Sequence, residues 1–242
     1  MDKKKLKEIL KNHVKWLNGN DGERLNLQGA YLREANLLEA DLREANLRGA
    51  DFRKADLRGA NLREANLRGA NLREANLRGA NLRKANIRGA DLWGANLRGA
   101  DFWGADLWRA NLREANLRGA DLREANLRGA NLWEADLREA KLPDFQICPE
   151  EGSFIAWKKL DTGICKLLIP EDAKRTSCLI NRKCRASHAK DLEGNGRSKT
   201  VNSKLEYREG NMVYADKFCD DIRLDCSHGI HFFMTRKEAE EW

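Results

Sequence analysis

The sequence of 242 residues contains no long apolar stretch. No run approaches the roughly eighteen residues of a membrane-spanning helix. The lysines near the start are followed by the mixed stretch 6–14 rather than by the hydrophobic core of a secretory signal. We therefore expect a soluble, cytoplasmic protein with no membrane partner.

Motifs of the common catalytic and cofactor-binding sites are also missing. The chain has no C-x-x-C pair and no glycine-rich phosphate loop, because its many Gly-Ala pairs belong to a repeat. No oxyanion-hole signature accompanies its cysteines and histidines. We expect no enzymatic activity and no cofactor.

Cysteine is absent from the first half of the chain. All six cysteines lie in the last hundred residues, and in a reducing cytosol we expect free thiols. One cluster has the residue types that zinc binds: Cys219, Cys226, His228 and His231. Its spacing, C-x6-C-x-H-x2-H, matches no familiar zinc finger, and Cys184 or Cys178 would have to join through the fold. We predict no metal site and keep zinc as an alternative at these four residues.

What fills the first half of the sequence is a repeat of five residues. From Ala30 to Ala140 an alanine recurs at every fifth position, and the unit reads Ala-(Asn/Asp)-Leu-Arg-(Gly/Glu). The bulky centre of the unit occurs 24 times from Leu27 to Leu142, usually as Leu and occasionally as Phe or Ile. Chance does not produce so regular a pattern, so the repeat defines the fold of this part.

A period of five fits neither a regular helix nor a straight strand. Five residues advance about 500° on an α-helix, so the leucines would wind around all sides. On a straight strand they would alternate between the two faces. If the chain turns once per unit, however, alanine and leucine both point inward and the other side chains point outward. The turns also let successive layers pair their backbones as parallel strands do.

These units resemble those of the pentapeptide-repeat proteins, whose family folds as a right-handed, four-sided β-helix. The resemblance covers about half of the chain. It implies an all-β solenoid, a right-handed four-sided parallel β-helix of about six coils, each contacting only its neighbours. Residues twenty apart would then stack in columns.

We expect three segments. Residues 1–24 form an N-terminal helical cap, because Leu6, Ile9 and Leu10 line one side of a helix over 3–17 that can cover the open first coil. His13 lies on the same apolar side and is expected to be packed. Residues 25–142 form the repeat, and residues 143–242 form a small β-rich domain that caps the last coil.

In the last segment, turn residues separate short apolar stretches. We expect a loop over 191–204, a last helix that starts at a capping box of Thr235 and Glu238, and strands at 153–160, 164–169, 178–180, 211–215 and 230–234. The stretches 173–186 and 220–234 resemble a C-terminal domain of unknown function attached to pentapeptide repeats in clostridial and phage proteins. That resemblance implies a bacterial or phage-related protein and brings no chemistry with it.

The chain has a net charge of +7, and the charge of the repeat is spread unevenly over its expected faces. One face gathers five arginines against the single acid Asp106, and it holds our partner-binding candidates: Arg48, Arg68, Arg88, Trp108, Arg109 and Arg128. The alternative is that arginine only covers the coils, since it occupies the same unit position on all faces. On the next face, Trp93, Arg113 and Trp133 are expected to stack as an aromatic–cation–aromatic ladder.

Three functions fit these features. The first is a non-catalytic interaction protein, a rigid scaffold that presents columns of Arg and Trp to a macromolecular partner, for which we favour a protein. The second is weak, sequence-independent nucleic-acid binding through the basic face. The third is a metal-binding or enzymatic C-terminal domain.

Two further expectations concern partners. Some pentapeptide-repeat proteins of the quinolone-resistance group mimic DNA and bind DNA gyrase, but that role needs an acidic surface, so the positive charge argues against it here. A free hydrophobic patch on the last domain would favour a homodimer through that domain.

Overall fold

A computed structural model describes residues 2–198, 205–225 and 227–242. The chain divides into two compact units, Met1–Asp144 and Phe145–Trp242, which are described separately below. In the described part of the chain, no helix is both long and apolar enough to cross a membrane.

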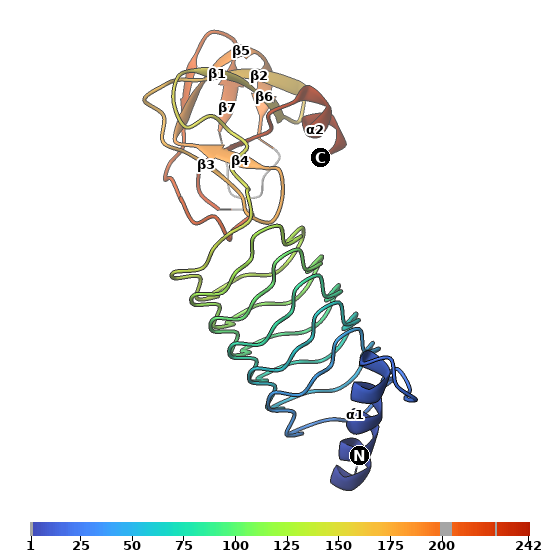
Figure 1. The fold of residues 1–242 in the computed structure, drawn as a ribbon. Coiled ribbons are helices and arrows are strands. Elements are labelled where there is room, and N and C mark those ends of the chain that lie inside the picture. Colours follow the sequence, from blue (N-terminus) through green and yellow to red (C-terminus); the bar gives the residue numbers. More distant parts are fainter. Residues whose placement is uncertain (1, 199–204, 226) are drawn as a thin grey trace. The chain divides into compact units, whose positions relative to one another are not determined.

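The repeat winds as a stack of coils (Figure 1). Parallel bridges join residues twenty apart, from Asn26↔Asn46 through Asp121↔Lys141, so one coil takes four units. The bulky centres from Leu27 to Leu132 are buried, and so is every repeat alanine from Ala45 to Ala135. The sequence-based prediction that a turn in every unit hides both residue types is confirmed.

The backbone N–H groups of one interior unit account for this geometry. The N–H groups of Asn46, Leu47 and Gly49 donate to carbonyl oxygens of neighbouring coils, at 2.9, 2.8 and 3.0 Å. Ala45 N–H donates to Leu42 O within the turn (3.2 Å), and Arg48 N–H donates to the Asn46 side chain (3.4 Å). All five donors are satisfied, three of them by another coil.

The last contact explains a preference that the sequence-based argument left open. Asn or Asp stands second in the unit because its side-chain oxygen accepts the N–H of the residue two positions later, as in an Asx turn. The same contact recurs through the stack, for example at Arg68 (3.1 Å) and Arg138 (3.1 Å).

The fifth residue of each unit has a left-handed backbone. Its φ is +64° at Gly49 and +60° at Glu64, as the third residue of a type II turn requires. Glycine adopts this conformation freely, whereas a residue with a side chain pays about 1 kcal/mol or more for it. A Cβ added at Gly69 would meet nothing within 4 Å, so the backbone angle and not crowding favours glycine there.

Helix α1 (Lys3–Leu17) has the bounds that the sequence predicts and packs on the first coil through His13. In interior coils, a carbonyl such as Arg48 O accepts the N–H of Gly29 in the preceding coil. Arg43 lies in the first coil, so no preceding coil offers a backbone N–H to its carbonyl oxygen. His13 Nε2 lies 3.0 Å from that oxygen and takes the place of this donor. His13 Nδ1 accepts the N–H of Leu25 (3.1 Å), so Nε2 carries the proton of a neutral ring. The packed role predicted for His13 is confirmed, and its ring substitutes for missing backbone partners.

The second unit contains three antiparallel sheets and a short helix (Figure 1). The four-stranded sheet has the order β1 (Phe154–Lys159), β2 (Ile164–Ile169), β5 (His188–Glu193), β8 (Met212–Tyr214). The three-stranded sheet consists of β3 (Arg175–Ser177), β4 (Cys184–Ala186) and β9 (Ile230–Phe232), and β6 (Asn195–Arg197) pairs with β7 (Glu206–Arg208). Buried side chains of these strands, among them Leu167 and Phe232, form its core.

The sequence-based assignments in this unit are partly wrong. Strands β1, β2, β8 and β9 match expected strands, and α2 (Arg236–Glu241) begins at the expected capping box, with both bonds between Thr235 and Glu238 present. The expected strand at 178–180 is wrong, because those residues connect β3 to β4. The expected loop at 191–204 is also wrong, since β5 and β6 enter it; residues 199–204 lie outside the described residues.

We predict that Leu77→Ala destabilises the coil stack by about 2–5 kcal/mol, because it empties a buried position between two neighbouring coils. Urea unfolding followed by circular dichroism measures the change. The matched control is Arg78→Ala in the same unit, which removes an exposed side chain and should cost less than about 0.5 kcal/mol. Equal losses in the two variants would show that Leu77 is not in the core.

A second prediction concerns pH. Burial lowers the pKa of His13 below its ordinary 6.5. The unfolded chain therefore takes up a proton near pH 6.5 that the folded chain does not, and stability falls as the pH drops below that value. We expect a slope of at most about 1.4 kcal/mol per pH unit from this group. His13→Gln should remove that part of the slope in urea titrations between pH 7.5 and 5.5, and an unchanged slope would contradict the assignment.

Candidate interaction face of the repeat

The partner-binding candidates lie on one side of the coil stack, which we call the basic face. It consists of units 25–29, 45–49, 65–69, 85–89, 105–109 and 125–129, whose second residues are joined by successive bridges. The structure therefore brings the predicted column together: Arg48, Arg68, Arg88, Trp108 and Arg128, with Arg109 beside Trp108. The arginines are exposed and Trp108 is half-buried.

Pairing of arginine on the coil stack depends on the second residue of the unit. Where this residue is Asp, its carboxylate pairs with the arginine two positions later, as in Asp56 with Arg58, where Oδ1 lies 2.8 Å from Nε and Oδ2 lies 2.6 Å from Nη2. The same pair forms at Arg43, Arg53, Arg123 and Arg138. Hydrogen bonding from Arg138 lowers the pKa of Asp136 to about 2. Where the residue is Asn, a carboxylate of the same unit can come only from a Glu at the fifth position, as Glu64 pairs with Arg63 (3.7 Å) and Glu114 with Arg113 (3.0 Å).

A second carboxylate can come from the following coil. Asp91 lies 3.6 Å from Arg73, Asp101 lies 3.3 Å from Arg83, and Asp106 lies 3.5 Å from Arg88. In each pair the acid stands eighteen positions after the arginine, so the next coil brings it alongside. An arginine with Asn at both places, and with Gly after it, gains a carboxylate from neither of these two sources. A glutamate twenty-one positions later is a third source, as Glu139 is for Arg118 (2.6 Å).

On the basic face, two arginines have Asn at both of these positions and Gly after them. Arg48 and Arg68 follow Asn46 and Asn66 and lie below Asn66 and Asn86, and glycine follows each arginine. Among the ion pairs of the described residues, none includes Arg48, Arg68 or Arg128, and Arg88 has only Asp106. The adjacent side of the stack differs, because all four of its arginines are paired: Arg33, Arg53, Arg73 and Arg113.

Among the described residues, arginines without an ion pair also occur on a third side of the stack, but they are a smaller share of the arginines there. Arg78 and Arg98 also sit in Asn-Leu-Arg-Gly units on a third side, and in the described ion pairs neither has a carboxylate. That side also carries the pairs of Arg58, Arg118 and Arg138. The basic face is thus the side with the largest share of uncompensated arginine.

Trp108 is held by two guanidinium groups. Arg88 of the preceding coil lies 4.6 Å from the ring centroid and Arg109 lies 4.2 Å from it. The other repeat tryptophans follow the same rule, since each ring contacts the arginine one coil earlier: Arg73–Trp93, Arg83–Trp103 and Arg113–Trp133. Of the expected ladder, the contact between Arg113 and Trp133 is confirmed, at 4.2 Å. Among the cation–π contacts of the described residues none joins Arg113 to Trp93, which contacts Arg73 of the preceding coil at 4.6 Å. These contacts stabilise the surface of the coil stack.

The described residues of the zinc alternative do not form a metal site in the structure. His228 is exposed and contacts Asp216 (3.4 Å), whereas His231 is buried and burial lowers its pKa to about 3. The backbone N–H of Cys219 donates to the backbone oxygen of His228 (3.0 Å), and Cys226 lies outside the described residues. Within residues 2–198, 205–225 and 227–242, no three His, Cys, Asp or Glu side chains gather to hold a metal.

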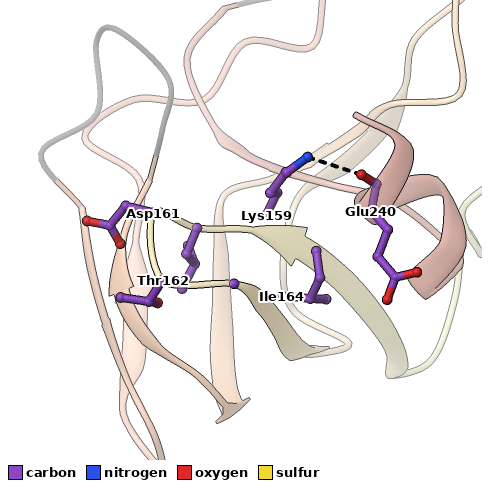
Figure 2. Close-up of a pocket in the computed structure, with 7 residues that line it drawn as sticks. Lys159, Asp161, Thr162, Ile164 and Glu240 are labelled. Atoms are coloured by element: carbon purple, nitrogen blue, oxygen red, sulfur yellow. Dashed lines mark hydrogen bonds between the residues drawn. The ribbon is translucent and has the colours of Figure 1, made fainter.

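A shallow pocket beside the β1–β2 turn offers no catalytic constellation (Figure 2). Lys159 donates to the backbone oxygen of Glu240 (3.0 Å), and Asp161 accepts the N–H of Arg197 (2.7 Å). Thr162 donates to Asn195 O. These three polar side chains of the pocket thus hydrogen-bond to backbone groups of neighbouring segments.

Comparisons with known proteins agree with these two units. The model of the pentapeptide repeats matches residues 26–144 in overlapping segments, and a family of unknown function, DUF5758, matches residues 145–239. No curated protein matches the chain.

Solved structures of similar proteins match about half of this chain. HetL, a pentapeptide repeat protein involved in heterocyst differentiation regulation in the cyanobacterium Nostoc, is 31% identical over 50% of this chain and 77% of its own, with a TM-score of 0.31. A pentapeptide repeat protein of the Arabidopsis thaliana thylakoid lumen is 36% identical over 43% and 69%, with a TM-score of 0.33. The plasmid-mediated fluoroquinolone resistance protein QnrB1 is 25% identical over 52% and 70%, also with a TM-score of 0.33.

The period of five, the coils of twenty residues and the matched family models lead to one conclusion. The chain is a pentapeptide-repeat protein that carries a C-terminal DUF5758 domain of unknown function.

Proposed function

We propose that this protein is a non-catalytic scaffold whose basic face docks an acidic surface of a partner protein. One observation carries the proposal: Arg48, Arg68 and Arg128 project from a rigid backbone without a carboxylate, while the arginines of the adjacent side are all paired. Stacked coils are about 4.8 Å apart, so neighbouring guanidinium groups repel by about 1 kcal/mol in water. Acidic side chains of a partner would relieve this repulsion.

The charge on the face favours a protein over a nucleic acid. Five arginines against one acid give a modest field, and a duplex presents one phosphate charge per about 1.7 Å. Such a face would bind nucleic acid weakly, without sequence preference and with strong salt dependence. The same positive charge argues against DNA mimicry, which needs an acidic surface.

We extend the proposal to the geometry of the coils, the compartment and the oligomeric state. We propose a right-handed, four-sided β-helix of about six coils, covered by α1 at its N-terminal end. We further propose that the protein acts in the cytoplasm and that a homodimer, if one forms, uses the C-terminal domain.

The choice of Asn or Asp in the unit gives a specific test. In Asn46→Asp/Asn66→Asp, new carboxylates should pair with Arg48 and Arg68 as Asp56 pairs with Arg58. We expect the variant to bind a fluorescent polyglutamate peptide at least about fivefold more weakly than the original chain at 50 mM salt, and we expect binding to fade by about 200 mM. Fluorescence anisotropy measures both.

The matched control is Asn61→Asp/Asn81→Asp, which changes the net charge by the same amount. It alters a side of the stack where Arg63 and Arg83 already pair with Glu64 and Asp101. We expect this control to keep most of the affinity. Equal losses in both variants would show a nonspecific charge effect and contradict the docking face. A labelled DNA duplex that binds more tightly than the peptide, with the same dependence on the basic face, would favour nucleic acid instead.

A further inference from the structure

Two buried cysteines of the C-terminal domain meet at one serine. Ser177 ends β3 and pairs across the sheet with Cys184 of β4. Its hydroxyl oxygen lies 3.4 Å from the sulfur of Cys148 and 3.6 Å from the sulfur of Cys184. All three residues are buried, with at most 2% of their surface exposed. The strands thus hold two thiols, far apart in sequence, around a single hydroxyl group.

The hydroxyl proton of Ser177 points to Cys148. The backbone N–H groups of Ile147 (3.0 Å) and Cys148 (3.2 Å) donate to the Ser177 oxygen and occupy its lone pairs. Its single proton is therefore free to donate to the Cys148 sulfur. The Gln146 amide adds a second donor at 3.5 Å.

The surroundings favour a thiolate at one of the two sulfurs. Hydrogen bonds from the Cys184 thiol and from Ser177, with the nearby charge of Arg175, lower the pKa of Cys148 although burial opposes them. The pKa of Cys184 is raised, because its proton bonds to Cys148 and because it is buried. One sulfur is thus set up as a nucleophile and the other keeps its proton beside it.

We propose that Cys148 and Cys184 form a redox-active pair that hydrogen peroxide oxidises to a disulfide. This pair lies outside the basic face and does not depend on the docking function. A disulfide would link Cys148, which precedes β1, to Cys184 of strand β4. The covalent loop closed in this way would contain β1, β2 and β3.

The chemistry balances in two steps. The Cys148 thiolate attacks the peroxide, so a sulfur–oxygen bond forms, the oxygen–oxygen bond breaks, and hydroxide leaves and takes up a proton. The sulfur of Cys184 then attacks the sulfenic acid, so the disulfide forms and water leaves with the Cys184 proton. The two thiols lose two electrons and the peroxide becomes two waters.

Two other cysteines of the domain, Cys165 and Cys178, have different surroundings. Cys165 donates to the Asp191 carboxylate (3.2 Å), and burial and that carboxylate raise its pKa. Cys178 donates to the backbone oxygen of Leu224 (3.5 Å), and burial raises its pKa too. Both should remain unreactive thiols while Cys148 reacts.

The test uses the full chain, reduced, desalted and exposed to a small excess of hydrogen peroxide. Free thiols are then blocked with N-ethylmaleimide, and the protein is digested with trypsin without reduction. Trypsin cuts after Arg182 and Lys183, which separates Cys178 from Cys184. We expect mass spectrometry to find the peptide of Cys148 linked to that of Cys184, lighter than the two thiols by about 2 Da.

Variants separate the roles of the two sulfurs. In Cys184→Ser we expect Cys148 to accumulate as a sulfenic acid that dimedone traps, and in Cys148→Ser we expect Cys184 to stay reduced. Cys178→Ser is the matched control and should leave the linked peptide unchanged. A folded chain in which Cys148 stays reduced, is oxidised only beyond the sulfenic acid, or links to a cysteine other than Cys184 would overturn the proposal.

Discussion

Hydrogen bonding between coils is the constraint on which this structure depends. Three of the five N–H groups in an interior unit are satisfied only by a neighbouring coil, as Asn46, Leu47 and Gly49 show. An isolated unit would leave them to water, so a coil is stable only in a stack. The first coil lacks a preceding coil and therefore lacks some backbone hydrogen-bond partners. The His13 ring replaces two of them, because Nδ1 accepts the N–H of Leu25 and Nε2 donates to Arg43 O.

The same constraint separates the fold from the surface. Alanine, leucine and the left-handed fifth residue fix the path of the chain. Asn and Asp serve the turn equally well, because one side-chain oxygen of either residue accepts the backbone N–H two positions later. Only Asp adds a charge, so exchanging the two changes which arginines are paired without altering the core. The basic face therefore depends on Asn instead of Asp at the second position of its units, a difference that the fold itself does not require.

Much of the repeat could be predicted from the sequence because its contacts are set by a local period. One corner per unit follows from burying Leu77 and Ala80 together, and α1 follows from a simple apolar stripe. The pairing of Arg58 with Asp56 was not predicted, although the sequence carries a signal for it, because Asp-Leu-Arg and Asn-Leu-Arg units differ in their second residue. The C-terminal domain was less predictable, because short strands such as β3 and β4 owe their pairing to partners distant in sequence and not to their own composition.

The distance between two points on the basic face tests the stacked coils most directly. Spin labels at Arg48 and Arg128, in a chain whose native cysteines are replaced, can be measured by double electron–electron resonance. Four coil steps of about 4.8 Å place these positions about 19 Å apart along the stack. A narrow distribution near 20 Å is the predicted result. A helical path would place them about 120 Å apart, and a broad or much longer distribution would contradict the coil stack and the basic face built on it.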